Sequence, residues 1–423
     1  MVSRPAARIL RIGMAATGLG LASAAHAADS SPMGIDVKGL VDLRGIVSSP
    51  VRSWEDGGLG KTRYGGDAGG RRVLARAEAA LVIEPRINWD ITGLVQLNVA
   101  PEQHRSPDVI EAYLQYKPVP TGSWGVKLKA GMFFPPISLE NTGLAWTSPY
   151  TISSSAINSW VGEELRTFGG EATLIYRTDL AEVSVVGALH KLNDPAGTLL
   201  AWRGWAIHDR ETGPFDRVPL PQVRVIRPAG GLAKQSPDER PYVEIDKRVG
   251  YYAGFRVDLR DVGTVTLLRY DNRADDLMFA NGQWPWRTDF WSLGLKVPLP
   301  GDVDIVGQAM TGKTTVITTP RGPLVAADFQ SAYGLVSKAW GRHRLSLRAD
   351  WFKTKDVDTL TLPDNNNEHG YGLTASYIFR PTLKQRLTLE VLFIDSTRSE
   401  RQFFGLSTRA KESQFQISYR FFL

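Results

Sequence analysis

The sequence has no cysteine among its 423 residues. Disulfide bonds and a cysteine-linked lipid anchor are therefore excluded, and the chain must be stabilised by burial and hydrogen bonding. It also has no long apolar run: beyond its first residues, no segment approaches the ~18 apolar residues that a membrane-spanning helix needs. If this chain enters a membrane, it must do so as strands.

Histidine is scarce, and no catalytic pattern accompanies it. No two histidines have the spacing of a metal-binding pair, and the G-x-S-x-G pattern of a nucleophile elbow is absent. We therefore expect no enzyme and no bound cofactor or metal. Beyond residue 27 the histidines are His104, His190, His208, His343 and His369.

The excess of positive over negative charge is also small. The formal net charge is +6, and the first 27 residues contain three arginines and no acid, which leaves about +3 for the remainder. A balance this mild gives no case for a nucleic-acid partner.

The first residues have the pattern of a secretory signal. Arg4, Arg8 and Arg11 are followed by a weakly apolar stretch from Ile12 to Leu21, and residues 25–27 read Ala-His-Ala, a small-x-small cleavage site. We expect residues 1–27 to be a signal peptide for the Sec pathway and residues 28–423 to be a single domain.

The rest of the chain shows apolar and polar residues in alternation, the pattern of strands with one apolar face. The segments are mostly ten to thirteen residues long, whereas strands in soluble proteins average about five or six and a tilted bilayer-crossing strand needs ~9–11. There are about sixteen of them, at approximately 35–47, 71–84, 87–99, 108–117, 125–133, 168–178, 181–192, 248–259, 262–273, 288–298, 302–313, 328–339, 342–354, 369–380, 384–396 and 411–423.

The connections between these segments alternate in length. After every second segment the connection is short, as near Pro85, Asp179 and Pro300. The others are longer, including 48–70, 134–167, 193–247 and four loops of about fourteen residues, with only 100–107 brief. Short turns at one end and long loops at the other are typical of an outer-membrane barrel. We predict an all-β, antiparallel up-and-down transmembrane barrel, with short periplasmic turns and long extracellular loops, closed by the last segment against the first.

The two faces of the segments indicate that this barrel is apolar outside. In 248–259, Tyr251, Phe255 and Leu259 share one face, while Arg256 and Asp258 share the other. A packed soluble core would not accept those charges unpaired, but a water-filled interior would. A soluble propeller should show internal repeats, and we see none. Aromatic residues near the short turns suggest an interfacial girdle: Trp89, Tyr116, Trp124, Tyr176, Trp340, Tyr377, Phe379 and Phe421.

A barrel of about sixteen strands leaves an aqueous channel, which predicts a porin. The loop 134–167 is too long for a bare hairpin connection and is largely uncharged, so we expect it to fold inward and narrow the channel. Its charged residues are Glu140, Glu163, Glu164 and Arg166.

Around this loop the chain resembles a known family, the phosphate-selective porins O and P. The likeness lies in residues 128–141, "LKAGMFFPPISLEN", where a strand runs into two prolines and then Leu139 and Glu140. The resemblance implies a homotrimeric channel in the outer membrane of a Gram-negative bacterium, passing small anions along a path lined by lysine and arginine.

The alternation also assigns side chains to the pore wall. We hypothesise that a basic wall faces the acidic loop across the narrow region, giving a transverse field that favours small polar solutes. Only a weak charge preference follows, because inward acids nearly balance the inward bases. The predicted pore-lining basic residues are Lys38, Arg44, Arg72, Arg76, Lys127, Lys129, Arg344 and Arg348.

Two alternatives to a general diffusion porin stay open. One is a channel specific for an organic acid, a sugar or an aromatic compound, for which the long external loop 193–247, with Trp202, Trp205 and Phe215, would form a binding vestibule. That loop could equally cap the barrel or contact lipopolysaccharide. An outer-membrane enzyme is a more distant alternative. In each case the expected surroundings are the lipid bilayer, lipopolysaccharide and small solutes or anions.

Overall fold

The computed structural model describes residues 33–67, 69–358 and 364–423. The predicted signal peptide, residues 1–27, lies outside the described residues. In the described part of the chain, no helix is both long and apolar enough to cross a membrane.

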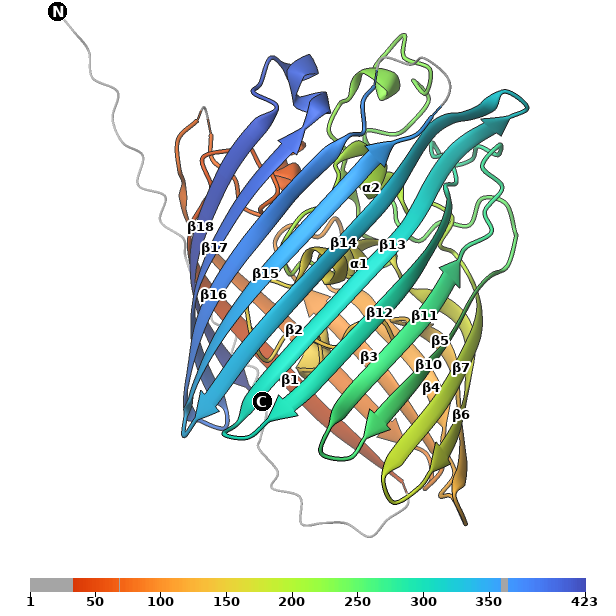
Figure 1. Ribbon diagram of the computed structural model, residues 1–423, viewed down its shortest axis with the longest axis vertical. Helices are drawn as coiled ribbons and strands as arrows, with labels where there is room; N and C mark the ends of the chain where they lie inside the picture. The colour runs from red at the N-terminus through yellow and green to blue at the C-terminus, as the bar shows by residue number, and fades with distance from the viewer. Residues whose placement is uncertain (1–32, 68, 359–363) are drawn as a thin grey trace, which may run out of the picture.

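Within the described ranges, sixteen strands form a closed antiparallel barrel, which confirms the predicted fold class (Figure 1). Each predicted segment overlaps one of them. The strands are β1 (Gly34–Val47), β2 (Val73–Arg86), β3 (Ile91–Val99), β4 (Asp108–Tyr116), β5 (Trp124–Phe133), β6 (Thr167–Arg177), β7 (Ala181–Lys191), β10 (Gly250–Leu259), β11 (Gly263–Asp271), β12 (Arg287–Leu299), β13 (Val303–Thr319), β14 (Gly322–Trp340), β15 (His343–Asp356), β16 (Glu368–Thr382), β17 (Gln385–Arg398) and β18 (Arg409–Phe422).

The barrel closes through its first and last strands. β18 runs antiparallel to β1, with Val41 opposite Phe421 and Val47 opposite Phe415. β7 pairs directly with β10, because β8 (Val218–Pro219) and β9 (Asp238–Glu239) form a separate two-stranded sheet in the intervening loop. Closure leaves no open sheet edge whose backbone groups would be unpaired in lipid.

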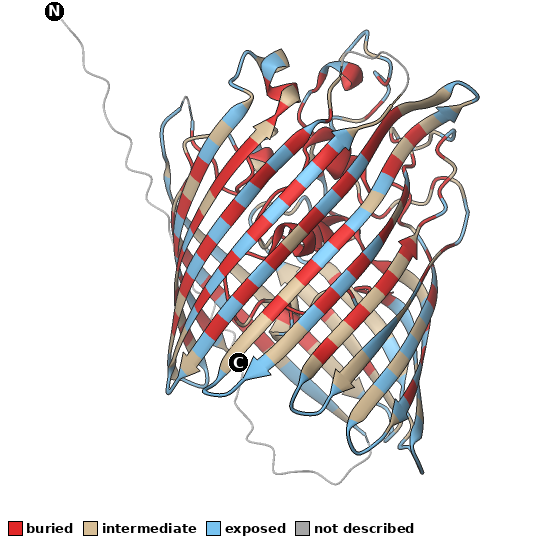
Figure 2. Cartoon of the chain, in the orientation of Figure 1, coloured by how far each residue is buried: buried red, intermediate tan, exposed pale blue. Residues whose placement is uncertain are grey.

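The barrel wall is apolar outside and polar inside, as the alternation predicts. Along β15, Leu345 and Leu347 are 44% and 56% exposed, whereas Arg348 and Asp350 on the other face are both 2% exposed. Figure 2 shows the same alternation of exposed and buried positions along the neighbouring strands. Exposed leucines beside buried charges are the reverse of a soluble core and suit a lipid-facing exterior.

Short turns lie at one end of the barrel and long loops at the other (Figure 1). Trp124 and Trp340, at strand ends beside short turns, are 60% and 44% exposed, and the Trp124 ring lies 4.7 Å from that of Tyr176. Their position is that of an interfacial aromatic girdle.

One predicted loop is wrong. Residues 314–327 are not a long connection: β13 continues to Thr319 and β14 begins at Gly322, which makes a tight hairpin. The polar alternation fails here because the inner face of this extension does not meet water. Val316 and Val325 are fully buried in an apolar cluster with Trp202 and Trp286.

The loop between β5 and β6 folds into the barrel and carries η2 (Leu144–Trp146) and α1 (Ala156–Glu164), whose residues are all buried. Figure 1 shows α1 inside the ring of strands. The ring of Trp160 lies 5.4 Å from that of Phe290 in β12 and 5.3 Å from that of Phe329 in β14. Aromatic contacts of this kind fix α1 against the wall.

The long segment 193–247 also enters the barrel, so the expectation that it is an external loop is wrong for its first part. This segment carries α2 (Thr198–Trp202) and η3 (Arg224–Ile226). Trp205 is fully buried, and its Nε1 donates to the carbonyl of Lys353 in β15 at 3.1 Å. At Gly197, where φ is 106°, a Cβ atom would lie 2.2 Å from Oγ1 of Thr314. Burial of its apolar side chains stabilises the segment inside the barrel, away from water.

The remaining short helices, η1 (Trp54–Asp56) and η4 (Ser399–Phe404), lie in other loops at the same end of the barrel.

Candidate functional site

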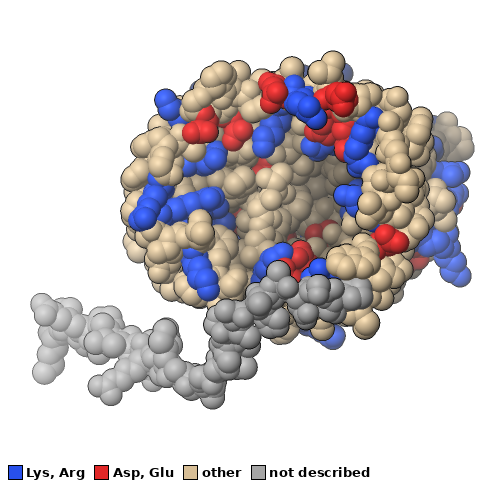
Figure 3. All heavy atoms as spheres, turned by 90° about the horizontal axis from the view of Figure 1, so that it is seen from below, with Lys and Arg blue, Asp and Glu red and all other residues tan. Residues whose placement is uncertain are grey.

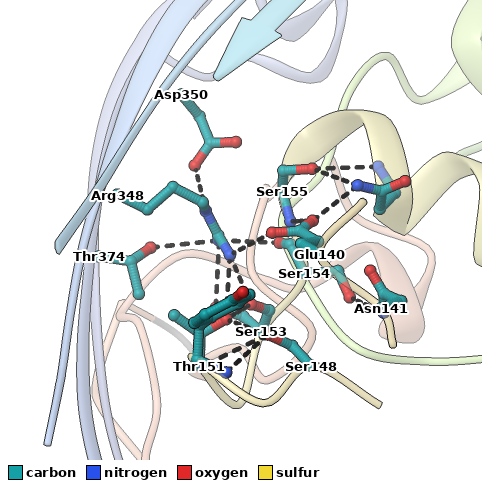
Figure 4. A network of polar contacts seen from close by, with 12 residues as sticks. Glu140, Asn141, Ser148, Thr151, Ser153, Ser154, Ser155, Arg348, Asp350 and Thr374 are labelled. Atoms are coloured by element: carbon teal, nitrogen blue, oxygen red, sulfur yellow. Dashed lines mark hydrogen bonds and ion pairs between the residues drawn. The ribbon is translucent and has the colours of Figure 1, made fainter. Parts of the chain in front are cut away.

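A buried arginine of the barrel wall binds the loop between β5 and β6, which folds into the barrel. Arg348 in β15 donates from Nη1 to the carbonyl of Ser153 at 2.7 Å and from Nη2 to that of Ser154 at 2.8 Å (Figure 4). Its Nε donates to Asp350 at 2.8 Å. Arg348, predicted to line the pore, therefore lies beneath the loop and fixes its backbone.

Carboxylates of the same wall bind the backbone N–H groups of this loop. Glu390 in β17 accepts from Ile152 at 2.6 Å and from Ser153 at 3.1 Å. Asp350 accepts from Ala156, the first residue of α1, at 3.0 Å. Carboxylates paired with N–H groups at a helix start are stabilising, so the loop has a defined position on the wall formed by β15 and β17.

Glu140, at the start of the loop, is completely buried. One of its oxygens accepts from the backbone of Ser155 at 2.6 Å and from Nδ2 of Asn158 at 2.8 Å, while the other lies 3.4 Å from Nη1 of Arg348. Figure 4 shows Glu140 between the loop and β15. Glu140 therefore binds the loop to β15 and is not exposed to the lumen.

Glu163 at the end of α1 is also buried. Its Oε2 lies 2.6 Å from Nη2 of Arg203 and 3.1 Å from Nε2 of His208, both from segment 193–247. Burial alone would raise the pKa of Glu163, but Arg203 and His208 lower it below its usual range. Glu163 is therefore an ionised link between the two segments inside the barrel.

Glu164 and Arg166 are satisfied internally as well. Glu164 accepts from the backbone N–H groups of Gly197 and Leu199 at 3.1 and 2.9 Å. Arg166 donates to backbone carbonyls, among them that of Ile110 at 3.1 Å, and its guanidinium lies 3.3 Å from the ring centroid of Phe134. The hypothesis of a basic wall facing an acidic loop is therefore wrong, because the charges of this loop are used to bind protein.

A cavity lies between this loop and the opposite wall, and we call it the eyelet cavity. On the loop side it is lined by neutral residues, including Asn141, Trp146 and Ser148. On the other sides it is bounded by β1, β2, β3 and β18 and by residues 209–211. Its charged lining residues are Asp42, Arg44, Arg63, Glu78, Glu102, Asp209, Arg210, Glu211 and Arg420.

Most charges of the eyelet cavity belong to one ion-pair network, which Arg210 and Glu211 do not join: Arg210 pairs with Glu55 and Asp216, and amide groups donate to Glu211. Arg44 lies 2.8 Å from Asp42, 3.2 Å from Glu78 and 2.6 Å from Asp209. Arg63 lies 2.6 Å from Glu78 and 3.0 Å from Glu102. Four arginines and five carboxylates line the cavity. Such a lining is strongly polar but gives no positive field.

Glu211 is the unusual acid of this cavity. Nε2 of Gln96 and Nδ2 of Asn98 donate to its Oε2 at 3.0 and 3.2 Å. Burial raises the pKa of Glu211 to about 8, opposed by Arg166. At neutral pH it is mainly protonated, which brings the cavity closer to charge balance.

The other residues predicted to line the pore lie along the lumen at several heights, and their role stays a prediction. Arg72 lies 2.7 Å from Asp56, a residue of a loop at the long-loop end. Lys129 lies over the rings of Tyr113 and Phe133, at 4.7 and 4.6 Å from their centroids. The remaining contacts are Arg76 with Glu102 at 3.1 Å, Lys38 with Glu84 at 2.5 Å, Lys127 with Glu171 at 3.6 Å and Arg344 with Asp304 at 3.3 Å.

Several lining residues were missed from the sequence. Arg63, Asp209, Arg210 and Glu211 belong to loops, where no alternation assigns a face. For Asp209, Arg210 and Glu211 the only signal was the mixture of charged and aromatic residues in 193–247, a segment to which Arg63 does not belong.

The lumen opens toward the short-turn end. Figure 3 shows this end as a hollow, with lysine and arginine side chains along much of its edge and acidic side chains among them. The mouth at this end is therefore lined by charges of both signs.

Comparisons with known proteins find similarity in structure alone. No family model and no curated protein matches the sequence. The structure is similar to the outer membrane channel DcaP of Acinetobacter baumannii, with a TM-score of 0.57 and 11% identity over 93% of this chain and 99% of that one. It is also similar to OmpT, an outer membrane protein of Vibrio cholerae, with a TM-score of 0.50 and 10% identity over 94% and 99% of the two chains. At these identities the likeness shows the fold.

Proposed function

We propose that this chain is an outer-membrane porin, a passive channel for small hydrophilic solutes and ions, and not an enzyme. The single observation that supports this most strongly is the reversed wall of the closed barrel. Leu347 is exposed on the outside while Arg348, the next residue, is buried inside. An apolar exterior suits lipid, and a polar interior suits water and solutes.

The eyelet cavity supports a channel of weak charge selectivity. Its arginines are paired with carboxylates, so neither anions nor cations meet a large uncompensated field there. We propose that small neutral and charged solutes both pass, and that size is the main limit.

A channel selective for one class of solute is the second candidate. The observation that favours it is the entry of segment 193–247 into the barrel, where Asp209, Arg210 and Glu211 narrow the eyelet cavity from a second side. Two inserted segments give a site more polar groups in fixed positions than one constriction loop does.

Liposome swelling separates these candidates. Vesicles containing the purified protein are diluted into sugars of increasing size, into phosphate and into small carboxylates. Rates that fall smoothly with size would support the general porin. Rapid entry of one solute against its size would support the selective channel. If no solute enters and planar bilayers show no conductance, the channel proposal is wrong.

We further propose that the exterior contacts lipid and lipopolysaccharide in a Gram-negative outer membrane and that three copies assemble. The resemblance of residues 128–141 supports the trimer, and the exposed apolar rows support lipid contact. Chemical cross-linking in native membranes tests the assembly, for which a ladder ending at three chains is the expected result.

A further inference from the structure

Three carboxylates converge at the long-loop end of the barrel, between the end of β7 and the start of β10. We call Asp194, Glu244 and Asp246 the carboxylate cluster. One oxygen from each of the three lies within 4.8 Å of the others. Asp194 lies at the start of the inserted segment 193–247, and Glu244 and Asp246 lie at its end. The cluster therefore joins the two ends of that segment.

Backbone N–H groups fix the positions of these side chains. Oδ2 of Asp194 accepts from Ile245 at 2.5 Å and from Asp246 at 3.1 Å. Oε2 of Glu244 accepts from Leu192, just before the segment begins, at 3.1 Å. Each end of the segment thus provides donors to a carboxylate of the other end, and the spacing of the cluster is set by the backbone.

Two oxygens of the cluster have no hydrogen-bond donor. Asp194 is 3% exposed, and both of its donors bind Oδ2, so that Oδ1 has none among the described residues. Oε1 of Glu244 is buried and also has no partner in the described part of the chain. A buried carboxylate oxygen without a donor is costly unless a ligand satisfies it.

No basic side chain balances the charges of the cluster. Within the described ranges, no lysine, arginine or histidine nitrogen lies within 4.0 Å of any of the three carboxylates. Arg248, the nearest arginine in the sequence, pairs with Asp275 at 2.7 Å instead. Like charges held this close repel one another, so a proton or a metal ion has to balance part of the charge. A proton would balance one charge, whereas a divalent ion would balance two and bind the free oxygens as ligands.

We infer that the carboxylate cluster is a binding site for a divalent cation, and that Ca²⁺ is the ion that fits it best. Ca²⁺ takes oxygen ligands at about 2.3–2.6 Å, so two oxygens on one ion can lie up to about 5 Å apart. The cluster meets this spacing without rearrangement. Mg²⁺ holds its ligands at about 2.0–2.1 Å and demands stricter geometry. The all-carboxylate composition is that of a site for such hard cations, because transition metals favour histidine and cysteine.

The expectation of no bound metal came from the spacing of histidines, and it does not cover carboxylates that only the fold brings together. Asp194 and Asp246 are 52 residues apart in the sequence. A Ca²⁺ ion at the cluster would fix both ends of segment 193–247, whose residues 209–211 line the eyelet cavity. The ion would therefore stabilise the segment in its inserted position.

Isothermal titration calorimetry on the detergent-solubilised protein, refolded without lipopolysaccharide and treated with EDTA, tests the site. CaCl₂ is the probe and MgCl₂ the comparison, at constant ionic strength. We expect saturable binding of Ca²⁺ to one site, at least about tenfold tighter than that of Mg²⁺, because Mg²⁺ gives up its water reluctantly. Binding is measured without transport, so the result does not depend on the proposed channel function.

Glu244→Gln is the main variant, because Glu244 is partly exposed and the amide keeps an acceptor for Leu192 while it removes the charge. The affinity for Ca²⁺ should fall by about tenfold or more, since the charge count of the ligands sets the affinity of such sites. Asp258→Asn is the matched control, because this acid on β10 has its own arginine, Arg256, at 2.6 Å. It should leave the affinity unchanged.

Thermal unfolding provides a second measurement. Ca²⁺ should raise the unfolding temperature of the wild type and of Asp258→Asn but not that of Glu244→Gln, because a ligand that binds only the folded state stabilises it. If Glu244→Gln does not fold, Asp246→Asn keeps the test open. The inference is overturned if the wild type shows no saturable binding of Ca²⁺ up to about 10 mM, above the range of weak extracellular Ca²⁺ sites. It is also overturned if Glu244→Gln binds Ca²⁺ like the wild type.

Discussion

The eyelet cavity and the arginine arc, which consists of Arg344, Arg380, Arg386 and Arg420 on β15 to β18, are both rich in arginine. They differ in the groups that bind their guanidinium side chains. In the eyelet cavity, Arg44 and Arg63 each contact several carboxylates, one of which, Asp209, comes from an inserted segment. In the arc, Arg386 contacts only carbonyl and hydroxyl oxygens among the described residues.

Both kinds of arginine hold the protein together, but Arg44 and Arg63 do so through carboxylates and Arg386 does so through the carbonyls of Ser148 and Thr151. A guanidinium bound by two carboxylates has little charge left for a passing solute, whereas one bound by carbonyls keeps its full charge. The number of basic residues facing a lumen is therefore a poor guide to selectivity, and their partners are a better one.

The largest expected effect is at the acid shared by both regions. Asp42→Asn should lower the free energy of unfolding by about 3 kcal/mol, because it removes the only ion-pair partner of Arg420 among the described residues and one of the three carboxylates around Arg44. Urea unfolding followed by heat-modifiable gel mobility measures this loss. If Asp42→Asn were as stable as the wild type, the carboxylate of Asp42 would not be needed to balance Arg44 and Arg420.

Releasing the inserted loop should have the next largest effect. Arg348→Leu removes the donors to Ser153 and Ser154, so residues 140–155 should leave the wall and single-channel conductance should rise by about twofold. Arg348→Lys, which keeps the charge but loses the forked donors, should give an intermediate value. A conductance in Arg348→Leu equal to that of the wild type would show that the loop does not limit the channel.

The eyelet cavity should also respond to pH through Glu211. Its raised pKa, about 8, means that the folded state favours the protonated form. The stability that this provides is fully present below the normal glutamate pKa and is lost as pH rises through about 8. Above that pH an added negative charge in the cavity should shift reversal potentials toward cations. Glu211→Gln should abolish the shift, and a pH-independent selectivity in the wild type would contradict the assignment.

The smallest effects are expected where a charge is already uncompensated or well solvated. Arg386→Gln should change the free energy of unfolding by less than about 1 kcal/mol, because lost bonds to carbonyls are offset by relief of its repulsion with Arg420. Arg256→Gln should likewise stay within about 1 kcal/mol, as is usual for exposed ion pairs. A loss at Arg386 as large as that at Asp42 would erase the distinction between the two regions.

The barrel itself was predictable because the two faces of each strand have different surroundings, an apolar one outside the barrel and a polar one inside. Period-2 alternation, such as Leu345, Leu347 and Trp351 against Arg348 and Asp350, identifies strand and face together. Alternation does not identify a strand whose inner face packs against protein. At Val316 and Val325 the inner face is apolar, and the predicted strands therefore end too early.

The candidate site was less predictable for a related reason. Alternation states which way a side chain points but not what it meets, so Arg348 and Glu140 were expected beside water although both are buried against each other. Arg63 and Asp209 come from loops about 146 residues apart in sequence, and no local pattern connects them. Partners of this kind depend on how the inserted segments pack.

The pairing of β1 with β18 has a further consequence for biogenesis. Residues 40–47 have their hydrogen-bonded neighbours at 415–422, so the contact that completes the cylinder has nearly the greatest sequence separation this polypeptide allows. Folding slows as contacting residues become more distant along the chain. The seam can form only after the final strand has been made, and until then β1 and the last strand formed each have an open edge at which other chains could pair.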